Sequence, residues 1–224
     1  MRKLVNWLRC NKISLNASKT EIILFRRNGN PITKNLNFRL SGQKINPSSH
    51  AKYLGLILDE HLSWDKQLRE LTLKLSRSTG ILAKLRHYLD YKTLLSVYYA
   101  LFDSHVSYFL PNLGYTTAEN LNKIETIQRK ALRIIHFKSN RDSCQQLFVK
   151  SRILPISNQL ALKNCLFAYN FLKNNLPAYF RNFLTKTGEH HNHATRSSTN
   201  CLDIKRTNTV RYGTYNLANL ISID

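Results

Sequence analysis

The fold of this chain is decided between residues 64 and 89, which read WDKQLRELTLKLSRSTGILAKLRHYL. In an α-helix each residue turns by about 100°, and at that angle the apolar residues of this stretch share one broad stripe. The stripe consists of Trp64, Leu68, Leu71, Leu75, Leu82, Leu85 and Leu89. Lys66, Arg77 and Lys84 point almost directly away from it, and Arg69 lies not far from that direction. The pattern predicts a long amphipathic helix with a basic outer face.

Helical periodicity continues almost unbroken to about residue 180. It predicts helices over 64–89, 92–107, 118–137, 142–150 and 156–174, with Pro111-Asn112, Asn140 and Pro155 as breaks. After about residue 184 the composition turns to Thr, Ser, Asn, Arg and His, and the few apolar residues are not periodic. This change predicts a flexible basic tail.

Residues 1 to about 60 predict short strands and turns after a brief helix. Residues 20–25 form a nearly continuous apolar, β-branched run, typical of a strand covered on both faces. Residues 36–40 and 44–46 indicate a small hairpin, and residues 51–58 one further strand. The expected fold is therefore α+β, a sheet of about four strands followed by a mainly helical part.

The charge balance points to a polyanionic partner. Lys plus Arg total 34 against 13 for Asp plus Glu, which gives a net charge of +21 over 224 residues. A chain so charged repels itself unless a polyanion neutralises part of the charge, so nucleic acid is the leading partner. The basic residues are spread along the whole chain, which argues against a membrane surface. Ribosomal-type RNA binding stays open on charge alone.

The sequence gives no sign of membrane, disulfide or metal chemistry. No stretch reaches the roughly 18 to 20 apolar residues that span a bilayer, and the first residues are too polar for a signal peptide. We expect an intracellular protein, nuclear or cytoplasmic, with no membrane partner. The four cysteines lie far apart without a Cys-x-x-Cys pair, and nothing around His190, His191 and His193 would fix three metal ligands. We therefore predict reduced thiols and no metal site.

Short motifs follow one another in order along the chain. The first are Asn11-Lys12-Ile13-Ser14-Leu15-Asn16, Lys19-Thr20-Glu21 with Phe25, Leu40-x-Gly42-x-x-Ile45, KYLGLILD from Lys52 to Asp59, and Leu62-x-Trp64. The later ones are Lys84-Leu85-Arg86, Tyr98, Ser104, Tyr108 and IQRKALRI from Ile127 to Ile134. In order and spacing they resemble the C-terminal palm and thumb region of reverse transcriptases from non-LTR (LINE-type) retrotransposons. The resemblance covers roughly residues 1 to 180.

The resemblance implies a division of the chain and roles for a few residues. The division is a palm remnant at 1–60, a thumb at 61–110, a helical post-thumb extension at 111–184 and a flexible basic tail at 185–224. Lys19 would approach the nucleotide triphosphate as a general acid, and the alternative is a charged turn residue. Tyr53, Leu54 and Gly55 resemble the primer grip, where glycine lets the backbone pass close to the primer end. The alternative there is a glycine at a strand bulge.

The family's catalytic carboxylates are missing from this sequence. Nucleotidyl transfer by this family resembles the two-metal scheme, in which clustered aspartates hold Mg²⁺. Mg²⁺ is therefore implied for the full-length enzyme. Their Asp-Asp box is expected upstream of Met1, and this chain contains no Asp-Asp pair. Asp59-Glu60 is a poor substitute because adjacent strand residues point to opposite faces. For this chain we expect no cofactor and no DNA synthesis.

The sequence thus predicts a fragment of an RNA-directed DNA polymerase that retains template–primer binding. The expected phosphate contacts are Lys66, Arg69, Arg77 and Lys84, with Arg129, Lys130 and Arg133 in second rank. A merely solvated face is the alternative for both groups. The expected partners are an RNA/DNA template–primer duplex and the missing upstream palm. Three alternatives stay open: a stand-alone basic nucleic-acid-binding module, a reverse transcriptase active only as part of a longer chain, and a relic without a present role.

Overall fold

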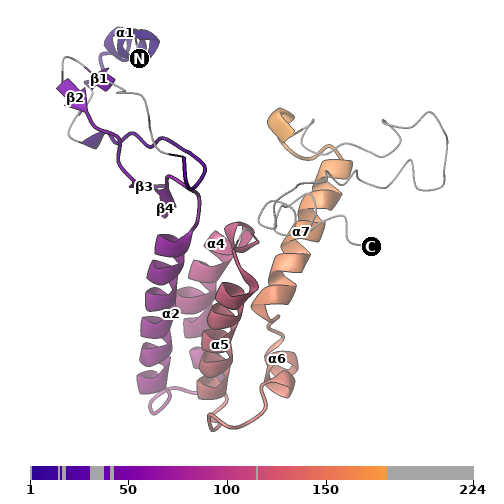
Figure 1. Ribbon diagram of the computed structural model, residues 1–224. Helices are drawn as coiled ribbons and strands as arrows, with labels where there is room; N and C mark the ends of the chain where they lie inside the picture. The colour runs from indigo at the N-terminus through magenta and orange to yellow at the C-terminus, as the bar shows by residue number, and fades with distance from the viewer. Residues whose placement is uncertain are drawn as a thin grey trace, which may run out of the picture. The chain divides into compact units, whose positions relative to one another are not determined.

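A computed structural model describes residues 2–14, 16, 19–30, 38–40, 43–114 and 116–180 (Figure 1). The chain divides into two compact units, Met1–Glu70 and Leu71–Asp224, and helix α2 (Asp65–Leu85) runs from the first into the second. Two small antiparallel sheets and a larger helical part confirm the α+β fold. The tail expected to be flexible, residues 185–224, lies outside the described residues.

The first unit contains helix α1 (Arg2–Cys10) and two separate β-hairpins. Strand β1 (Phe38–Leu40) pairs with β2 (Gln43–Ile45), and β3 (His50–Tyr53) pairs with β4 (Leu56–Asp59). The expected single sheet of about four strands is therefore wrong. The link between the hairpins contains Pro47, which has no N–H to extend a ladder of hydrogen bonds.

Residues 51–58 fold into a tight hairpin, so the expectation of one continuous strand is wrong. Leu54 and Gly55 connect β3 to β4 with positive φ angles of 48° and 83°. Positive φ at both residues of a two-residue connection is the mark of a type I′ turn, whose twist matches that of the flanking strands. The usual Asn or Asp of such turns is replaced here by leucine, so the sequence hides the turn.

The apolar segment 20–25 is not a strand either. Within it only Ile22 makes a β-bridge, a parallel one to Pro47, and the Ile22 carbonyl accepts the N–H of Ser48 at 2.8 Å. Because Pro47 has no N–H to donate, the pairing ends after one bridge. The side chains of Ile22, Ile23 and Leu24 are half-buried. An apolar, β-branched composition that finds only one bridge partner has given irregular chain instead of a strand.

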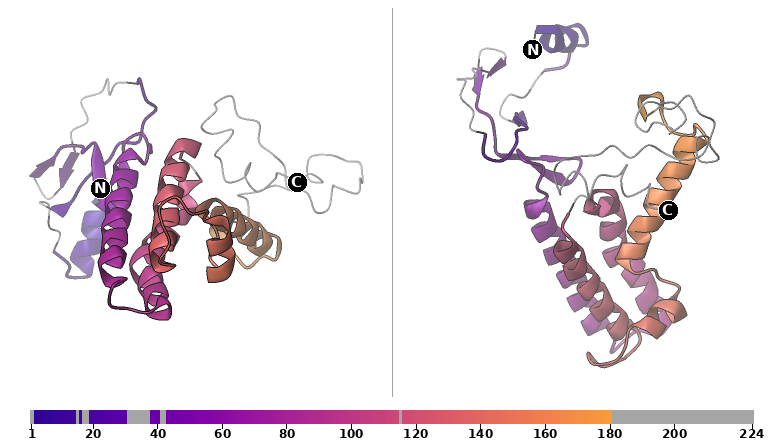
Figure 2. Two further views of the ribbon diagram at one scale, coloured as in Figure 1. Left: turned by 90° about the horizontal axis from the view of Figure 1, so that it is seen from below. Right: turned by 45° about the vertical axis from the view of Figure 1, so that its right-hand side comes forward.

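The second unit is built from helices that begin and end within a few residues of the predicted bounds, except that the helix expected to end at residue 107 continues to Leu113. After α2 come α3 (Tyr91–Tyr98), a π-helical turn η2 (Tyr99–Asp103), α4 (Ser104–Leu113), α5 (Ala118–Ile135), α6 (Gln145–Ser151), α7 (Ile156–Leu172) and the short 3₁₀ turn η3 (Ala178–Phe180). Helix α5 contacts α3, α6 and α7, and α4 packs on α7 (Figure 2). The largest fully buried side chains of the second unit include Leu75, Leu82, Tyr98, Phe102, Phe109, Leu132 and Ile135.

The wide turn η2 keeps one side of a long helical segment buried. Leu94, Tyr98, Phe102 and Val106 are all buried at a spacing of four residues. On a regular α-helix that spacing drifts by about 40° at each step. A π-helical turn holds one extra residue and absorbs this drift, and the rings of Tyr98 and Phe102 stack with centroids 5.0 Å apart. The break expected at Pro111 is absent, because α4 ends only at Leu113 and proline removes a single N–H near that end.

The amide of Gln128 joins three parts of the helical unit. This side chain of α5 is 0% exposed. Its Nε2 donates to the Tyr98 hydroxyl at 3.2 Å and to the Leu154 carbonyl at 3.0 Å, while its Oε1 accepts the Ile156 N–H at 3.1 Å. One buried polar group thus links α3 to the start of α7. A buried amide is tolerated only when its hydrogen bonds are made, and here they are.

Candidate nucleic-acid interface

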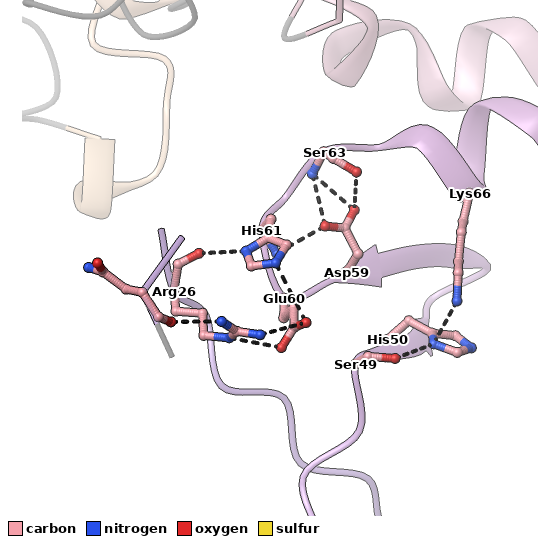
Figure 3. Close-up of polar contacts among 9 residues, drawn as sticks. Arg26, Ser49, His50, Asp59, Glu60, His61, Ser63 and Lys66 are labelled. Carbon is pink, nitrogen blue, oxygen red and sulfur yellow. Dashed lines mark hydrogen bonds and ion pairs between the residues drawn. The ribbon is translucent and has the colours of Figure 1, made fainter. Parts of the chain in front are cut away.

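The entry into α2 is organised by the carboxylate of Asp59 (Figure 3). It accepts the N–H of His61 at 2.9 Å, that of Ser63 at 2.9 and 3.0 Å and that of Trp64 at 3.0 Å. The Ser63 hydroxyl also donates to it at 3.0 Å. The backbone N–H groups just ahead of a helix need acceptors, and one side chain supplies them here. Asp59 therefore fixes the turn from which α2 begins.

The same contacts set the acidity of Asp59. Burial raises its pKa, but the hydrogen bonds from the Ser63 and His61 N–H groups, the Ser63 hydroxyl and the Trp64 N–H outweigh burial. The pKa of Asp59 consequently lies below its ordinary value, because each donor favours the charged carboxylate. The turn is held by an ionised group at neutral pH.

A second set of contacts holds the segment 19–30 to the end of β4. Arg26 binds Glu60 in a two-pronged ion pair, Nε to Oε2 at 3.1 Å and Nη2 to Oε1 at 3.0 Å (Figure 3). The Arg26 N–H donates to the Glu60 carbonyl at 2.9 Å, and His61 Nδ1 lies 3.0 Å from the Arg26 carbonyl. Planar paired bonds of this kind fix direction as well as distance. They fix the segment 19–30, which forms no strand, against the end of β4.

These contacts show whether the carboxylates of Asp59 and Glu60 could ligate the Mg²⁺ that the resemblance implies. Magnesium takes near-ideal octahedral oxygen ligands and usually keeps several waters. Both Asp59 oxygens already accept protein donors, and Glu60 is occupied by Arg26. The two carboxylates do not fit a magnesium site, and among the described residues no cluster of three or more His, Cys, Asp or Glu side chains forms one.

The basic residues predicted on α2 all face solvent. Lys66, Arg69, Arg77 and Lys84 are exposed, whereas Leu68, Leu71, Leu75 and Leu82 are buried. Lys66 lies with its Nζ 2.9 Å from His50 Nδ1 on β3. Over the described part of the chain, no carboxylate pairs with any of these four cations. Uncompensated cations along one helix face are what a polyanion would contact.

The second-rank residues on α5 differ in the contacts that they make. Arg129 pairs with the buried Glu125 one turn earlier, so its charge is compensated. Arg133 donates from Nε to the Asp142 carbonyl at 2.8 Å and so fastens the loop after α5. Lys130 is exposed and has no ion-pair partner in the described ranges. Of the three, Lys130 is the one available to an anion.

Lys130 also borders a groove of about 200 Å³ between α2 and α5. Its walls are Ser76, Thr79, Gly80 and Ala83 of α2 and Ile127, Lys130 and Ile134 of α5. A Cβ built on Gly80 would meet no atom within 4 Å. The glycine is therefore not required by packing inside the chain, and it leaves the wall of the groove open.

The remaining predicted residues lie at exposed turns. Tyr53 and Leu54, at the tip of the β3–β4 hairpin, are 64% and 72% exposed, and Gly55 completes the turn. Gly55 is thus a hairpin residue and not a strand bulge. Lys19 lies in a turn where its N–H donates to the Asn16 carbonyl at 3.2 Å and to Asn16 Oδ1 at 3.3 Å. The primer-grip and general-acid roles of these residues stay predictions.

The sequence suggested cysteines that mostly serve packing, and it missed three contacts. Cys10 and Cys165 are exposed and Cys144 is buried, all as free thiols, so packing explains only the last. The capping role of Asp59, the Arg26–Glu60 pair and the His50–Lys66 contact were not predicted. Asp59 offered a signal, because Asp shortly before Ser and a helix is typical of a capping turn. Residues 34 positions apart, such as Arg26 and Glu60, leave no local signal.

In comparisons with family models, curated proteins and solved structures, nothing matched this chain. Across the described residues, no helix has both the length and the apolar character needed to cross a bilayer.

Replacing Asp59 with Ala is expected to loosen the start of α2. The loss of a capping carboxylate costs about 0.5–2 kcal/mol, which corresponds to a roughly 2- to 30-fold faster amide hydrogen exchange at residues 61, 63 and 64. Because the folded pKa is lowered, the contribution is present above the unfolded value of about 3.9 and fades as pH falls through the folded pKa.

Asp65→Asn is the matched control, since Asp65 is exposed in the first turn of α2 and its carboxylate accepts no hydrogen bond within the described residues. It should leave exchange at 61, 63 and 64 nearly unchanged. Equal exchange rates in Asp59→Ala and Asp65→Asn would contradict the capping role.

Proposed function

We propose that this chain is the C-terminal palm and thumb region of a non-LTR retrotransposon reverse transcriptase, and that it holds a template–primer duplex without synthesising DNA by itself. The observation that carries the proposal is the row of Lys66, Arg69, Arg77 and Lys84 on the outer face of α2, unpaired with any described carboxylate. The ordered motifs supply the family. The row of cations supplies the retained activity.

The geometry of α2 suits a duplex backbone. From Lys66 to Lys84 the helix rises about 27 Å at 1.5 Å per residue, and the side chains carrying charge recur along that length. A hybrid duplex of A-like form presents a wide, shallow minor groove bordered by phosphates, which proteins contact by shape and charge. Contacts to phosphates carry no sequence information. We therefore propose largely sequence-independent binding.

The hairpin tip is the proposed contact to the primer end. Tyr53 and Leu54 are presented to solvent by a turn that requires positive φ at both Leu54 and Gly55. A leucine held in left-handed backbone is strained, and residues with such strain are found preferentially at functional sites. In a longer chain supplying the catalytic aspartates, Lys19 would serve as general acid. An upstream palm is then the protein partner, and the location is nuclear or cytoplasmic.

A stand-alone basic nucleic-acid-binding module is the second candidate. It is favoured by the core of the helical unit, where Tyr98, Phe102, Phe109 and Leu132 are fully buried by the chain itself. Cooperative unfolding of residues 1–180 alone would favour the module. Independent melting of residues 1–70 would favour a palm remnant that belongs to a larger protein.

The test is the salt dependence of binding to an RNA/DNA hybrid duplex. Each phosphate neutralised contributes about −0.9 to the slope of log affinity against log salt on B-DNA, and a hybrid should be similar. Replacing Lys66, Arg69, Arg77 and Lys84 together with Gln should reduce the slope by roughly two to four, while α2 stays helical because Gln is a good helix former. Fluorescence anisotropy over a salt series measures the slope.

The matched control removes the same charge elsewhere, with Gln at Lys3, Arg9, Lys163 and Lys173, all exposed on α1, α7 and the end of α7. Its slope should change by less than about one. If the α2 variant keeps the parent slope with helicity confirmed by circular dichroism, the face is only solvated, and the proposal loses its basis.

A further inference from the structure

The loop after α5 starts with a residue in an unusual backbone conformation. Phe137 has a φ of 57°. Its N–H donates to the Ile134 carbonyl at 3.1 Å, and the Lys138 N–H donates to the Arg133 carbonyl at 2.8 Å. This pair of bonds is the Schellman motif, in which glycine usually takes the left-handed position because it lacks a Cβ. Phenylalanine is strained there.

Three other helices of the chain end in the same motif, which allows a comparison. Lys12, Arg152 and Asn174 take the left-handed position after α1, α6 and α7. Asparagine tolerates this conformation, and Lys or Arg places a positive charge at the negative end of the helix. Phe137 has neither advantage. The reason for a phenylalanine at this position must therefore lie in its ring.

The ring of Phe137 is not used to fill the core. It is 48% exposed, and the Arg86 guanidinium lies 5.5 Å from its centroid. An arginine over an aromatic face is a weak attraction at an exposed site. It covers part of the ring and holds it in place, while about half of the side chain stays open to solvent.

A second exposed aromatic ring lies close to Arg86 in the sequence. Tyr88 follows Arg86 by two residues, in the turn after α2, and is 85% exposed. Figure 1 shows this turn and the loop after α5 at the same end of their helices, as the Arg86–Phe137 contact requires. Two open aromatic side chains thus stand at one end of the helical unit.

The surroundings of these rings are basic. Lys138 directly follows Phe137, and Lys150 precedes Ser151, whose hydroxyl lies 2.6 Å from His136 Nε2. Burial, and then the charges of Lys150 and Lys138, lower the pKa of His136. Two carboxylates also lie at this end, Asp90, which accepts the N–H groups of α3, and Asp142, which accepts the Ser139 N–H at 2.8 Å. They are outnumbered by Arg86, Lys138 and Lys150. The end of the unit therefore offers aromatic faces within a positive field.

We propose that Phe137 and Tyr88 form a stacking site for unpaired bases of single-stranded nucleic acid, with Arg86 and Lys138 beside the backbone phosphates. Stacking on aromatic rings within a basic groove is how proteins bind single strands without reading sequence. The site adjoins the Lys84 end of α2 but shares no residue with the row of Lys66, Arg69, Arg77 and Lys84. It extends the proposed function only in requiring a nucleic-acid partner, and it names single strands as a second ligand.

The test measures binding of a fluorescent ten-nucleotide oligouridine RNA to the full chain and to Phe137→Leu, Tyr88→Leu and the double variant. Leucine keeps apolar bulk but removes the ring, and the loss of base stacking should weaken binding by roughly 5- to 140-fold per base. The slope of log affinity against log salt should not change, since no charge is removed. Phe137→Trp should retain binding and show emission quenched by the RNA beyond that of the parent chain.

Tyr179→Leu is the matched control, because Tyr179 on η3 is 89% exposed and lies beyond the opposite end of α7 from α6. It should bind RNA like the parent. Affinity within twofold of the parent in the double variant, with unchanged thermal unfolding, would overturn the site, and so would a parent chain that does not bind the RNA. Hybrid-duplex binding with an α2-dependent salt slope would still stand in either case, so the two proposals fail separately.

Discussion

Replacing Gln128 with Ala is expected to destabilise the helical unit by roughly 3–5 kcal/mol. The buried Ile156 N–H would lose its acceptor and the Tyr98 hydroxyl its donor, each at a cost of about 1–3 kcal/mol. The removed side-chain atoms would also leave a cavity. The Leu154 carbonyl would not be orphaned, because Gln159 Nε2 also donates to it at 2.8 Å. Urea unfolding followed by circular dichroism measures the difference.

The matched control for this variant is Gln145→Ala. Gln145 is exposed in the first turn of α6, so its loss should change stability by no more than about 0.5 kcal/mol. Similar midpoints for Gln128→Ala and Gln145→Ala would show that the buried amide is not the link between α3 and α7.

The second large effect is the absence of catalysis. With a primed RNA template, Mg²⁺ and deoxynucleoside triphosphates, the purified chain is expected to extend no primer above the level without protein. Nucleotide transfer in the family needs aspartates that hold the metal, and this sequence has no Asp-Asp pair. The Asp59 and Glu60 carboxylates are committed to the capping turn and to Arg26. Denaturing gels with labelled primer give the readout, and an active reverse transcriptase serves as positive control.

A double variant, Asp59→Asn with Glu60→Gln, separates contamination from activity in this chain. Trace extension that is equal in the parent and the double variant would come from a contaminant or from groups other than this pair. Template-dependent extension that survives stringent purification would prove the prediction wrong, and its loss in the double variant would locate the metal ligands.

The helical part of the fold was predictable because its signal is local and repeated. The apolar stripe of α2 recurs every three to four residues, and Leu68, Leu71, Leu75 and Leu82 are indeed buried. The same pattern correctly placed the basic residues on the outer face. What it could not give is the ion pair of Arg26, whose partner Glu60 is 34 residues away in sequence. The Glu125–Arg129 pair, four residues apart on α5, did have a local signal.

The β part was predicted less well, because strand identity depends on partners that local composition does not specify. The segment 20–25 has the residues of a buried strand but only one bridge, at Ile22. The run KYLGLILD looked continuous because its turn uses Leu54 and Gly55 instead of Asn-Gly. Gln128 belongs to the IQRKALRI motif. Its role depends on Tyr98, Leu154 and Ile156, which only the fold brings together.

The wide turn at Tyr99–Asp103 should make the segment from α3 to α4 tolerant of substitution but intolerant of a change in length. Tyr99, Ala100 and Leu101 are exposed, so their identities are weakly constrained. Deleting one of them would restore regular α-helical hydrogen bonds and swing every later side chain by about 100°. Val106, Phe109 and Leu110 would then turn out of the core they now fill. Selection on this turn would act on the number of its residues more than on their kind.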